Sequence, residues 1–191
     1  NYTDHDHLIE EDICQALQKN EESKDSLGAH SRRVFVASKV MPEHLHYEDV
    51  IIACERSLKR LGYLDVYFIH WPNPEIPIEE TMMAMNKLKK ERKIRYIGYS
   101  NCTVEQVKEA EQYGQIDFLQ WEYHLLERSI ETNGILGLQD KVLVTYSPFY
   151  HHRHISQTRR ALLQGLAEKN HMTEYQLVLY WILRHPNTLV I

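Results

Sequence analysis

The sequence has 191 residues, which is near the size of one domain and enough to bury a hydrophobic core. Hydrophobic residues make up 43% and charged residues 26%, a mixture typical of soluble globular proteins and unlike that of disordered or membrane-spanning chains. The formal net charge is −5, so we expect neither nucleic acid nor a membrane as a partner. No signal peptide opens the chain, and a cytoplasmic location is therefore expected.

The cysteines and histidines do not form a metal-binding or disulfide pattern. Cys14, Cys54 and Cys102 are odd in number, widely spaced and without a Cys-x-x-Cys pair. Two histidine-rich segments, residues 5–7 and 151–154, also lack the spacing of zinc ligands. We expect reduced thiols, exposed histidines and no metal.

Short β-rich runs alternate with longer amphipathic segments along most of the chain. The predicted strands are Val34 to Ser38, Asp65 to Ile69, Ile94 to Tyr99, Phe118 to Tyr123 and Val142 to Tyr146. The predicted helices lie near Tyr47 to Leu61, Ile78 to Lys89, Val104 to Tyr113 and Ile130 to Gln139. Strand midpoints fall about every 23 to 32 residues, the length of one βα unit, and each strand is apolar on both faces, which is typical of buried parallel strands.

This alternation predicts an α/β fold, and within that class a single (β/α)8 TIM-type barrel domain over residues 1–191. An open doubly wound sheet usually binds its nucleotide with a Gly-x-Gly-x-x-Gly turn after the first strand. The chain has only seven glycines and no such turn. In a barrel the active site lies at the C-terminal ends of the strands, so polar residues there are candidates for function.

Polar side chains do follow the predicted strands. Lys39, His70, Ser100, Asn101 and Ser147 come directly after strands, and Gln120 to Tyr123 lie late in the strand Phe118 to Tyr123. Each alone is compatible with a capped or solvated side chain. A lysine and a histidine that end two adjacent strands, with amides and hydroxyls ending the next ones, indicate a polar active-site mouth.

Several segments resemble the aldo-keto reductase family in order and spacing. They are VFVASKV, SLKRLGYLDVYFIHWP, KIRYIGYSN, FLQWEYHLLER and YSPF, and LVLYWILRHPNTLVI is similar to the family's closing helix and last strand. The resemblance covers nearly the whole chain, and Leu58 to Pro72 is its most specific part. It implies an NAD(P)-dependent oxidoreductase that reduces an aldehyde or ketone, with NADPH as the expected cofactor and NADH as the alternative.

The resemblance also assigns catalytic roles. Lys39 matches the lysine that lowers the pKa of a tyrosine acid, and Asp4 matches the aspartate that pairs with this lysine. His70 matches the histidine that orients and polarises the substrate carbonyl as hydride arrives. Trp71 matches an indole that lines the carbonyl pocket, although a rim residue packed on a loop is an equally good interpretation.

The cofactor-binding residues follow from the same resemblance. Ser100, Asn101 and Gln120 match the groups that hydrogen-bond the nicotinamide carboxamide. Tyr146 matches the aromatic residue that stacks on the nicotinamide ring. Ser147 and Phe149 match the turn that carries the pyrophosphate.

The N-terminal segment departs from the family pattern. Asn1 to Asp4 resembles the family's second strand and Ile9 to Leu17 the helix after it, but Ile9 stands where the catalytic tyrosine is expected. Three explanations are open. The connecting loop is truncated, or missing residues were skipped in the numbering, or the protein has lost the tyrosine that acts as the acid. Tyr2, His5 or His7 could then donate the proton. The first strand is also not found, so an incomplete barrel is expected.

Two other functions stay open. A chain that has lost its tyrosine could be a non-catalytic aldo-keto-reductase-like subunit or a redox-sensing binding protein. A barrel enzyme for a phosphorylated sugar is less consistent with the sequence, because glycine-rich phosphate loops are absent. The basic run Lys87 to Arg95 could suggest nucleic-acid binding, but it ends a predicted helix, where cations are favourable. The sequence indicates neither the carbonyl substrate nor the oligomeric state.

Overall fold

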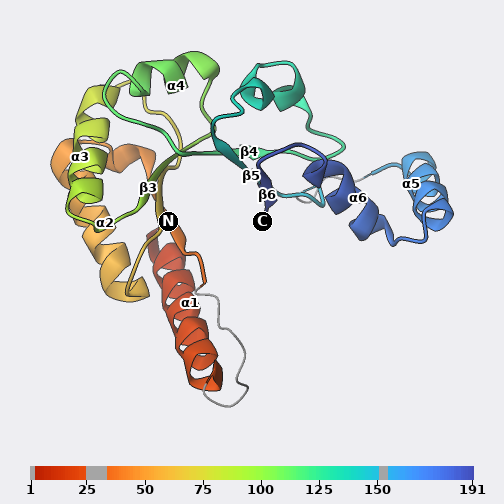
Figure 1. Cartoon of the computed structure of the whole chain (residues 1–191), viewed down its shortest axis with the longest axis horizontal. Helices are drawn as coiled ribbons and strands as arrows, with labels where there is room; N and C mark the ends of the chain where they lie inside the picture. The colour runs from red at the N-terminus through yellow and green to blue at the C-terminus, as the bar shows by residue number, and fades with distance from the viewer. Residues whose placement is uncertain (1–2, 25–33, 151–154) are drawn as a thin grey trace. The chain divides into compact units, whose positions relative to one another are not determined.

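The computed structural model describes residues 3–24, 34–150 and 155–191, in which helices and strands alternate (Figure 1). The described strands are β1 (Ala37–Val40), β2 (Val66–Ile69), β3 (Tyr96–Ser100), β4 (Phe118–Glu122), β5 (Val142–Tyr146) and β6 (Thr188–Val190). They form one sheet in chain order, and the registered pairs are parallel. The predicted parallel α/β fold is therefore confirmed.

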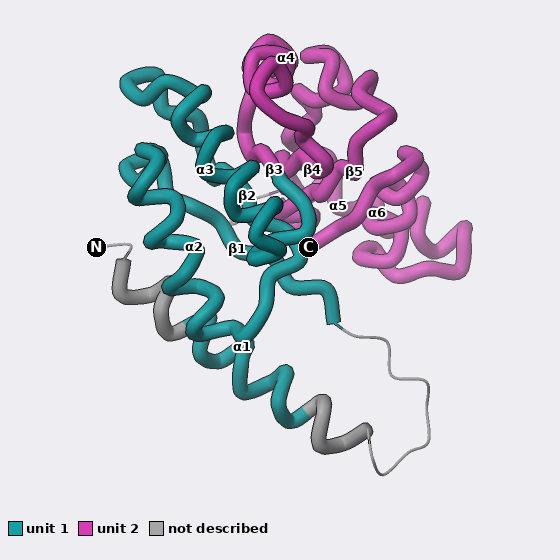
Figure 2. The backbone as a smooth tube through the Cα atoms, turned by 60° about the vertical axis from the view of Figure 1, so that its left-hand side comes forward, with its two compact units in different colours: residues 1–97 teal, residues 98–191 magenta. Residues whose placement is uncertain are grey.

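Helices connect these strands. The α-helices are α1 (Thr3–Lys24), α2 (Tyr47–Leu61), α3 (Ile78–Lys90), α4 (Val104–Ala110), α5 (Gln157–Lys169) and α6 (Glu174–Leu183). The short 3-10 helices are η1 (Pro42–His44), η2 (Ser129–Glu131) and η3 (Ile135–Gly137). The chain divides into two compact units, residues 1–97 and 98–191 (Figure 2), with the boundary inside β3. The prediction of one domain over residues 1–191 stays a prediction.

In the first unit, α2 packs against α1, α3 and β1 (Figure 1). Its bounds are those predicted from the periodicity, and Val50, Cys54 and Leu61 form its buried face. The helix ends at Gly62, whose φ of 82° is accessible because glycine has no Cβ. Its N–H donates to the carbonyl of Leu58 at 2.8 Å and so caps the helix.

A buried carboxylate aligns the first three strands at their N-terminal ends. Asp65 is 1% exposed, and its Oδ2 accepts the backbone N–H of Val36 at 3.0 Å. Its Oδ1 accepts from Nη1 of Arg95 at 3.0 Å, and its carbonyl accepts the backbone N–H of Tyr96 at 2.9 Å. Because these bonds fix where the strands begin, they also fix which residues reach the C-terminal edge.

In the second unit, β4 lies between β3 and β5, and α6 packs on β6. Thr103 and Gln106 form a capping box that starts α4, and Thr173 and Gln176 form another that starts α6. Lys141 is buried just before β5, where its Nζ donates to Glu111 at 2.5 Å. The two capping boxes explain why α4 and α6 begin where they do.

The N-terminal strand prediction was wrong. Instead of a strand from Asn1 to Asp4, α1 begins at Thr3 and continues to Lys24. No proline or glycine occurs between Thr3 and Leu27, so no breaker interrupts the helical pattern, and acidic residues are favourable near a helix start. Asp4 is thus a residue of the first helical turns.

Three other segments differ from the prediction. β1 begins at Ala37 rather than Val34, so Lys39 lies inside the strand. The helix predicted over residues 130–139 is replaced by η2 and η3, because Gly134 adopts a φ of 88° and breaks the helical path. Helix α5, which starts at Gln157 behind the N-cap Ser156, was not predicted.

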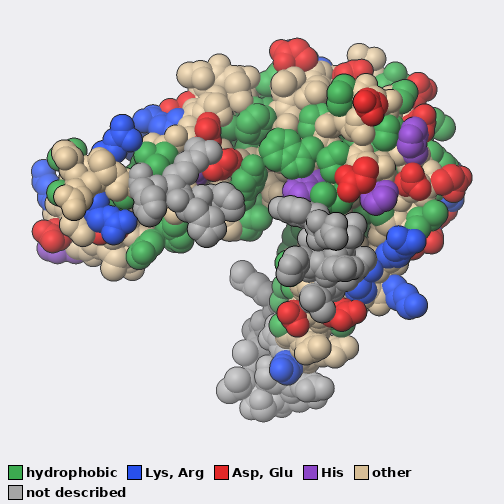
Figure 3. Space-filling view, turned by 180° about the vertical axis from the view of Figure 1, so that it is seen from behind, with side chains coloured by type: hydrophobic (Ala, Val, Ile, Leu, Met, Phe, Trp, Pro, Cys, Tyr) green, Lys and Arg blue, Asp and Glu red, His purple; other side chains and the backbone are tan. Residues whose placement is uncertain are grey.

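Figure 3 draws one face of the molecule with its side chains coloured by type. On the face drawn in Figure 3, acidic and basic side chains lie interspersed among neutral and apolar ones. Lys87, Lys89 and Lys90 occupy the last turn of α3, as predicted for a solvated helix end. Within the described ranges, no helix combines the length and apolar character needed to cross a membrane.

Candidate active site

Lys39, near the C-terminal end of β1, and His70, directly after β2, project from the same face of the first unit. Lys39 is in register with Phe68 in the parallel pair β1 and β2. His70 comes two residues after Phe68 and continues the ladder, because its backbone N–H donates to the carbonyl of Val40 at 3.0 Å. Since side chains alternate along a strand, those of Lys39, Phe68 and His70 share one face. Lys39 and His70 are both half-buried.

The opposite face of the same strands is covered by helices. Ser38, the neighbour of Lys39, places its Oγ 3.4 Å from Oγ of Ser57 on α2 and donates to Oε1 of Glu10 on α1 at 2.6 Å. Glu10 also pairs with Arg60 of α2 at 2.5 Å. Because this face is filled, the face that carries Lys39 and His70 points away from α2.

His70 has one sulfur contact that sequence reasoning missed. Its Nδ1 lies 3.2 Å from Sδ of Met41, the residue that follows β1. Asn73 ties the two strand ends further, because its Nδ2 donates to the carbonyl of Pro42 at 2.9 Å. Trp71, the predicted substrate contact, is 47% exposed and its ring centroid is 6.4 Å from that of His70. The side chain of Asp4 lies outside the described part, so its pairing with Lys39 stays a prediction.

The residues predicted to bind nicotinamide form one hydrogen-bonded network in the second unit. Oη of Tyr146 donates to Oδ1 of Asn101 at 2.9 Å, and Nδ2 of Asn101 donates to Oγ of Ser100 at 3.1 Å. Oγ of Ser100 lies 3.4 Å from Oε1 of Gln120. Ser100 and Gln120 are in register on neighbouring strands and are almost fully buried, whereas Asn101 and Tyr146 are half-buried. The network therefore runs from the core toward the C-terminal edge.

Two turns at this edge hold strained backbone. Asn101 has a φ of 56° and Ser147 a φ of 57°, backbone angles that residues other than glycine rarely adopt. Asn101 is held by its N–H, which donates to the carbonyl of Gln120 at 2.9 Å, and the turn at Ser147 is closed by the N–H of Tyr150 at 3.1 Å. Such strain persists where the surroundings fix it and is common at functional sites. Phe149 is 42% exposed and meets Tyr175 edge-on at 4.9 Å.

A glutamate and a histidine beyond Gln120 were not recognised from the sequence. Nε2 of the buried His124 lies 2.9 Å from Oε1 of Glu122, and Nδ1 of His124 accepts the N–H of Leu126 at 3.1 Å. Because Nδ1 accepts, the proton of the neutral ring is on Nε2 and is donated to the carboxylate. Glu122 is in register with Tyr146. The alternation Gln-x-Glu-x-His was the signal for this pair.

Comparison with known proteins agrees with the parallel α/β fold, which is part of an α/β barrel. The model of the aldo/keto reductase family matches residues 2–191, and the chain belongs to this family. The prediction made from the sequence motifs is therefore confirmed.

Two curated relatives are reductases of small dicarbonyl compounds by name. The chain is 34% identical over 179 residues to the glyoxal reductase of Bacillus subtilis (strain 168), an alignment that covers 89% of this chain and 63% of that protein. It is 36% identical over 120 residues to the NADH-specific methylglyoxal reductase of Escherichia coli (strain K12), covering 59% and 37% respectively.

Solved structures give the same family. A thermostable aldo-keto reductase crystallised with the inhibitor epalrestat matches with a TM-score of 0.82 and 38% identity over 95% of this chain and 65% of that one. An aldo/keto reductase from Klebsiella pneumoniae, in complex with NADP and acetate, matches with a TM-score of 0.80 and 32% identity over 95% and 64%. The described strands and helices thus correspond to part of a (β/α)8 barrel, and the chain spans less than two thirds of the length of these relatives.

Proposed function

We propose that this protein reduces an aldehyde or ketone to an alcohol with NADPH or NADH as the hydride donor. The observation that carries the proposal is the placement of Lys39 and His70 on one face at the ends of adjacent parallel strands. Carbonyl reduction creates negative charge on the substrate oxygen, and a cation beside an imidazole stabilises that charge. Membership in the aldo-keto reductase family supports the same chemistry.

Each catalytic residue has a proposed role. With a proton on Nε2, His70 donates a hydrogen bond to the carbonyl oxygen and so orients the substrate and polarises the bond. In the imidazolium form it does so while its Nδ1–H faces Met41. The ammonium of Lys39 favours the anionic form of the reacting oxygen and of a neighbouring acid, with Asp4 as its proposed partner. Trp71 forms a wall for the substrate. We assign no residue as the proton donor.

The second unit fits a nicotinamide cofactor. The hydroxyl of Ser100 and the amides of Asn101 and Gln120 can each donate and accept hydrogen bonds, as the carboxamide of nicotinamide requires. Oη of Tyr150 is buried without a hydrogen-bond partner among the described residues and lies on the turn that begins at Ser147, where a phosphate oxygen could accept from it. When bound, the reduced nicotinamide supplies the hydride.

We assign each residue of that unit a role in cofactor binding from the chemistry of its side chain. Ser100, Asn101 and Gln120 fix the face of the ring that meets the substrate, and the ring of Tyr146 stacks on it. Ser147 and Phe149 form the turn for the pyrophosphate. NADPH is the proposed cofactor because similar structures from Klebsiella pneumoniae contain NADP or NADPH, and NADH is the alternative because one relative is NADH-specific by name.

Lys39→Met tests the catalytic half of the proposal. With methylglyoxal and NADPH, we expect kcat/KM to fall at least about 100-fold, because the neutral side chain cannot stabilise developing charge. Lys59→Met changes an exposed lysine of α2 and is the matched control, with activity unchanged. Full activity in the Lys39 variant, with an intact fold by circular dichroism, would remove Lys39 from the mechanism.

A second function is supported by the residue at position 9. Ile9 stands where the family's tyrosine acid is expected, which favours a non-catalytic subunit or a redox-sensing binding protein that retains the cofactor pocket. Titration with NADPH and NADH, followed by cofactor fluorescence, separates the two functions. Binding without turnover of any aldehyde supports the sensor, whereas binding with turnover supports the reductase.

A further inference from the structure

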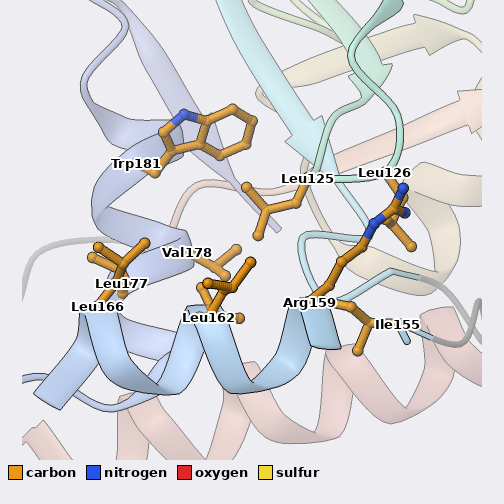
Figure 4. Close-up of a pocket in the computed structure, with 10 residues that line it drawn as sticks. Leu125, Leu126, Ile155, Arg159, Leu162, Leu166, Leu177, Val178 and Trp181 are labelled. Atoms are coloured by element: carbon orange, nitrogen blue, oxygen red, sulfur yellow. The ribbon is translucent and has the colours of Figure 1, made fainter. Parts of the chain in front are cut away.

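A cavity of about 670 Å³ lies in the second unit, outside the network of Ser100 and Tyr146 (Figure 4). Helices α5 and α6 form two of its walls, and Leu125 and Leu126, which follow β4, form a third. Its volume is within the range of about 300 to 1,000 Å³ that small-molecule sites occupy. The cavity is therefore large enough for a ligand of its own.

One wall is made of leucines that no described side chain covers. Leu162 and Leu166 on α5 are 66% and 55% exposed, whereas Leu163 and Ala167 of the same helix are 8% and 2% exposed. Helix α5 is thus anchored by buried side chains, and Leu162, Leu163 and Leu166 line the cavity (Figure 4). An apolar ligand that covers these leucines gains hydrophobic free energy in proportion to the area buried.

The opposite wall contains a fixed indole. Trp181 of α6 packs against the ring of Tyr123 at 4.8 Å, and the guanidinium of Arg128 lies 5.5 Å from its ring centroid. Tyr123 is itself held, because its hydroxyl donates to Glu131 at 2.7 Å and lies 2.9 Å from Nε2 of His185. A wall that is already ordered costs little conformational entropy when a ligand binds.

One cation is present among these apolar residues. Arg159 is in the first turn of α5, and Figure 4 shows its side chain extending toward Leu126 at the cavity. No acidic side chain in the described ranges pairs with its guanidinium, and its backbone N–H donates to Oγ of Ser156. An arginine beside an apolar wall recognises a ligand that has an apolar body and one carboxylate.

We propose that this cavity binds a medium-chain fatty carboxylate, with the alkyl chain between α5 and α6 and the carboxylate on Arg159. Leu125 and Leu126 follow β4, and Ile155 lies on the connection from β5 to α5. These strands also carry Gln120 and Tyr146, which belong to the proposed cofactor site. The inference concerns a separate ligand and does not depend on the reductase activity.

The test is calorimetric titration of the purified chain with decanoate and with decanol. We expect Arg159→Gln to weaken decanoate binding about 10-fold or more and to leave decanol binding unchanged, because only the carboxylate uses the guanidinium. Arg160→Gln is the matched control, since Arg160 is the next residue, is exposed and does not line the cavity. Equal effects of the two substitutions, or no binding of decanoate by the unmodified chain, would overturn the proposal.

A second variant tests the apolar wall without removing charge. Leu162→Gln combined with Leu166→Gln changes two exposed positions, so the fold is expected to persist. Binding of both decanoate and decanol should fall, since both place an alkyl chain on this wall. Unchanged binding of both ligands would locate them elsewhere and refute the site.

Discussion

The side chains of His70 and Met41 meet at the ends of β1 and β2, with 3.2 Å between Nδ1 of the imidazole and Sδ of the thioether. A thioether has no hydrogen to donate and is a weak acceptor. The contact is therefore attractive only when Nδ1 of His70 carries a proton. In the neutral ring Nε2 is then an acceptor, whereas in the imidazolium Nε2 is also a donor.

Met41→Leu should change the tautomer of His70. Leucine cannot accept a hydrogen bond, so the neutral ring loses the group that favours a proton on Nδ1 and shifts toward the Nε2–H form. ¹⁵N NMR of labelled protein measures this ratio, with His70 assigned by its absence in His70→Gln. Met83→Leu, at an exposed position of α3, is the control and should leave the spectrum unchanged. An unaltered tautomer in the Met41 variant would show that the sulfur has no such role.

Tyr146→Phe should weaken NADPH binding modestly, by about 3- to 10-fold, the usual range for one hydrogen bond. The ring stays in place for stacking, but Oδ1 of Asn101 loses the 2.9 Å hydrogen bond that orients its amide. Tyr146→Ala removes the ring as well and should weaken binding further. Cofactor fluorescence gives both affinities, with Tyr180→Phe on the exposed side of α6 as control. If Tyr146→Phe and the unmodified chain bind NADPH with equal affinity, the Tyr146 hydroxyl does not contribute to cofactor binding.

The sequence predicted elements whose signals are local. The bounds of α2 follow from its 3.6-residue period, and β5 was found at Val142–Tyr146 because its apolar run is bounded by polar residues. The position of His70 at a strand end was also readable, since an apolar run ends there. These patterns depend on each segment alone, so periodicity captures them.

Features that depend on tertiary contacts were not predictable. β1 starts later than its apolar run because Asp65 takes the backbone N–H of Val36 into a side-chain hydrogen bond before the strand begins. The pairing of Met41 with His70 joins residues 29 positions apart, and no period relates them. The break at Gly134 depends on a positive φ that the amino acid permits but does not require.

Asp65→Ala should destabilise the protein by about 1–3 kcal/mol, because the buried N–H of Val36 is left without its acceptor. Arg95→Ala should cost clearly less than Asp65→Ala, since the Arg95 side chain is 55% exposed and water solvates that end of the pair. Urea unfolding of both variants measures the difference in free energy of unfolding. A loss for Arg95→Ala as large as that for Asp65→Ala would mean that the ion pair, and not the backbone acceptor, stabilises the strand starts.

The three cysteines should differ in reactivity. Burial raises the pKa of Cys54 and that of Cys102 to about 12, whereas Cys14 is only partly buried on α1. Since the thiolate is the nucleophile, roughly one molecule in 10⁴ carries it at either buried site at pH 8, and still roughly one in 10³ at pH 9. Iodoacetamide should therefore modify Cys14 first and the other two at least about 100-fold more slowly, with all three similar in urea. Peptide mass spectrometry over time measures each rate, and rapid labelling of Cys54 in the folded protein would contradict its position on the buried face of α2.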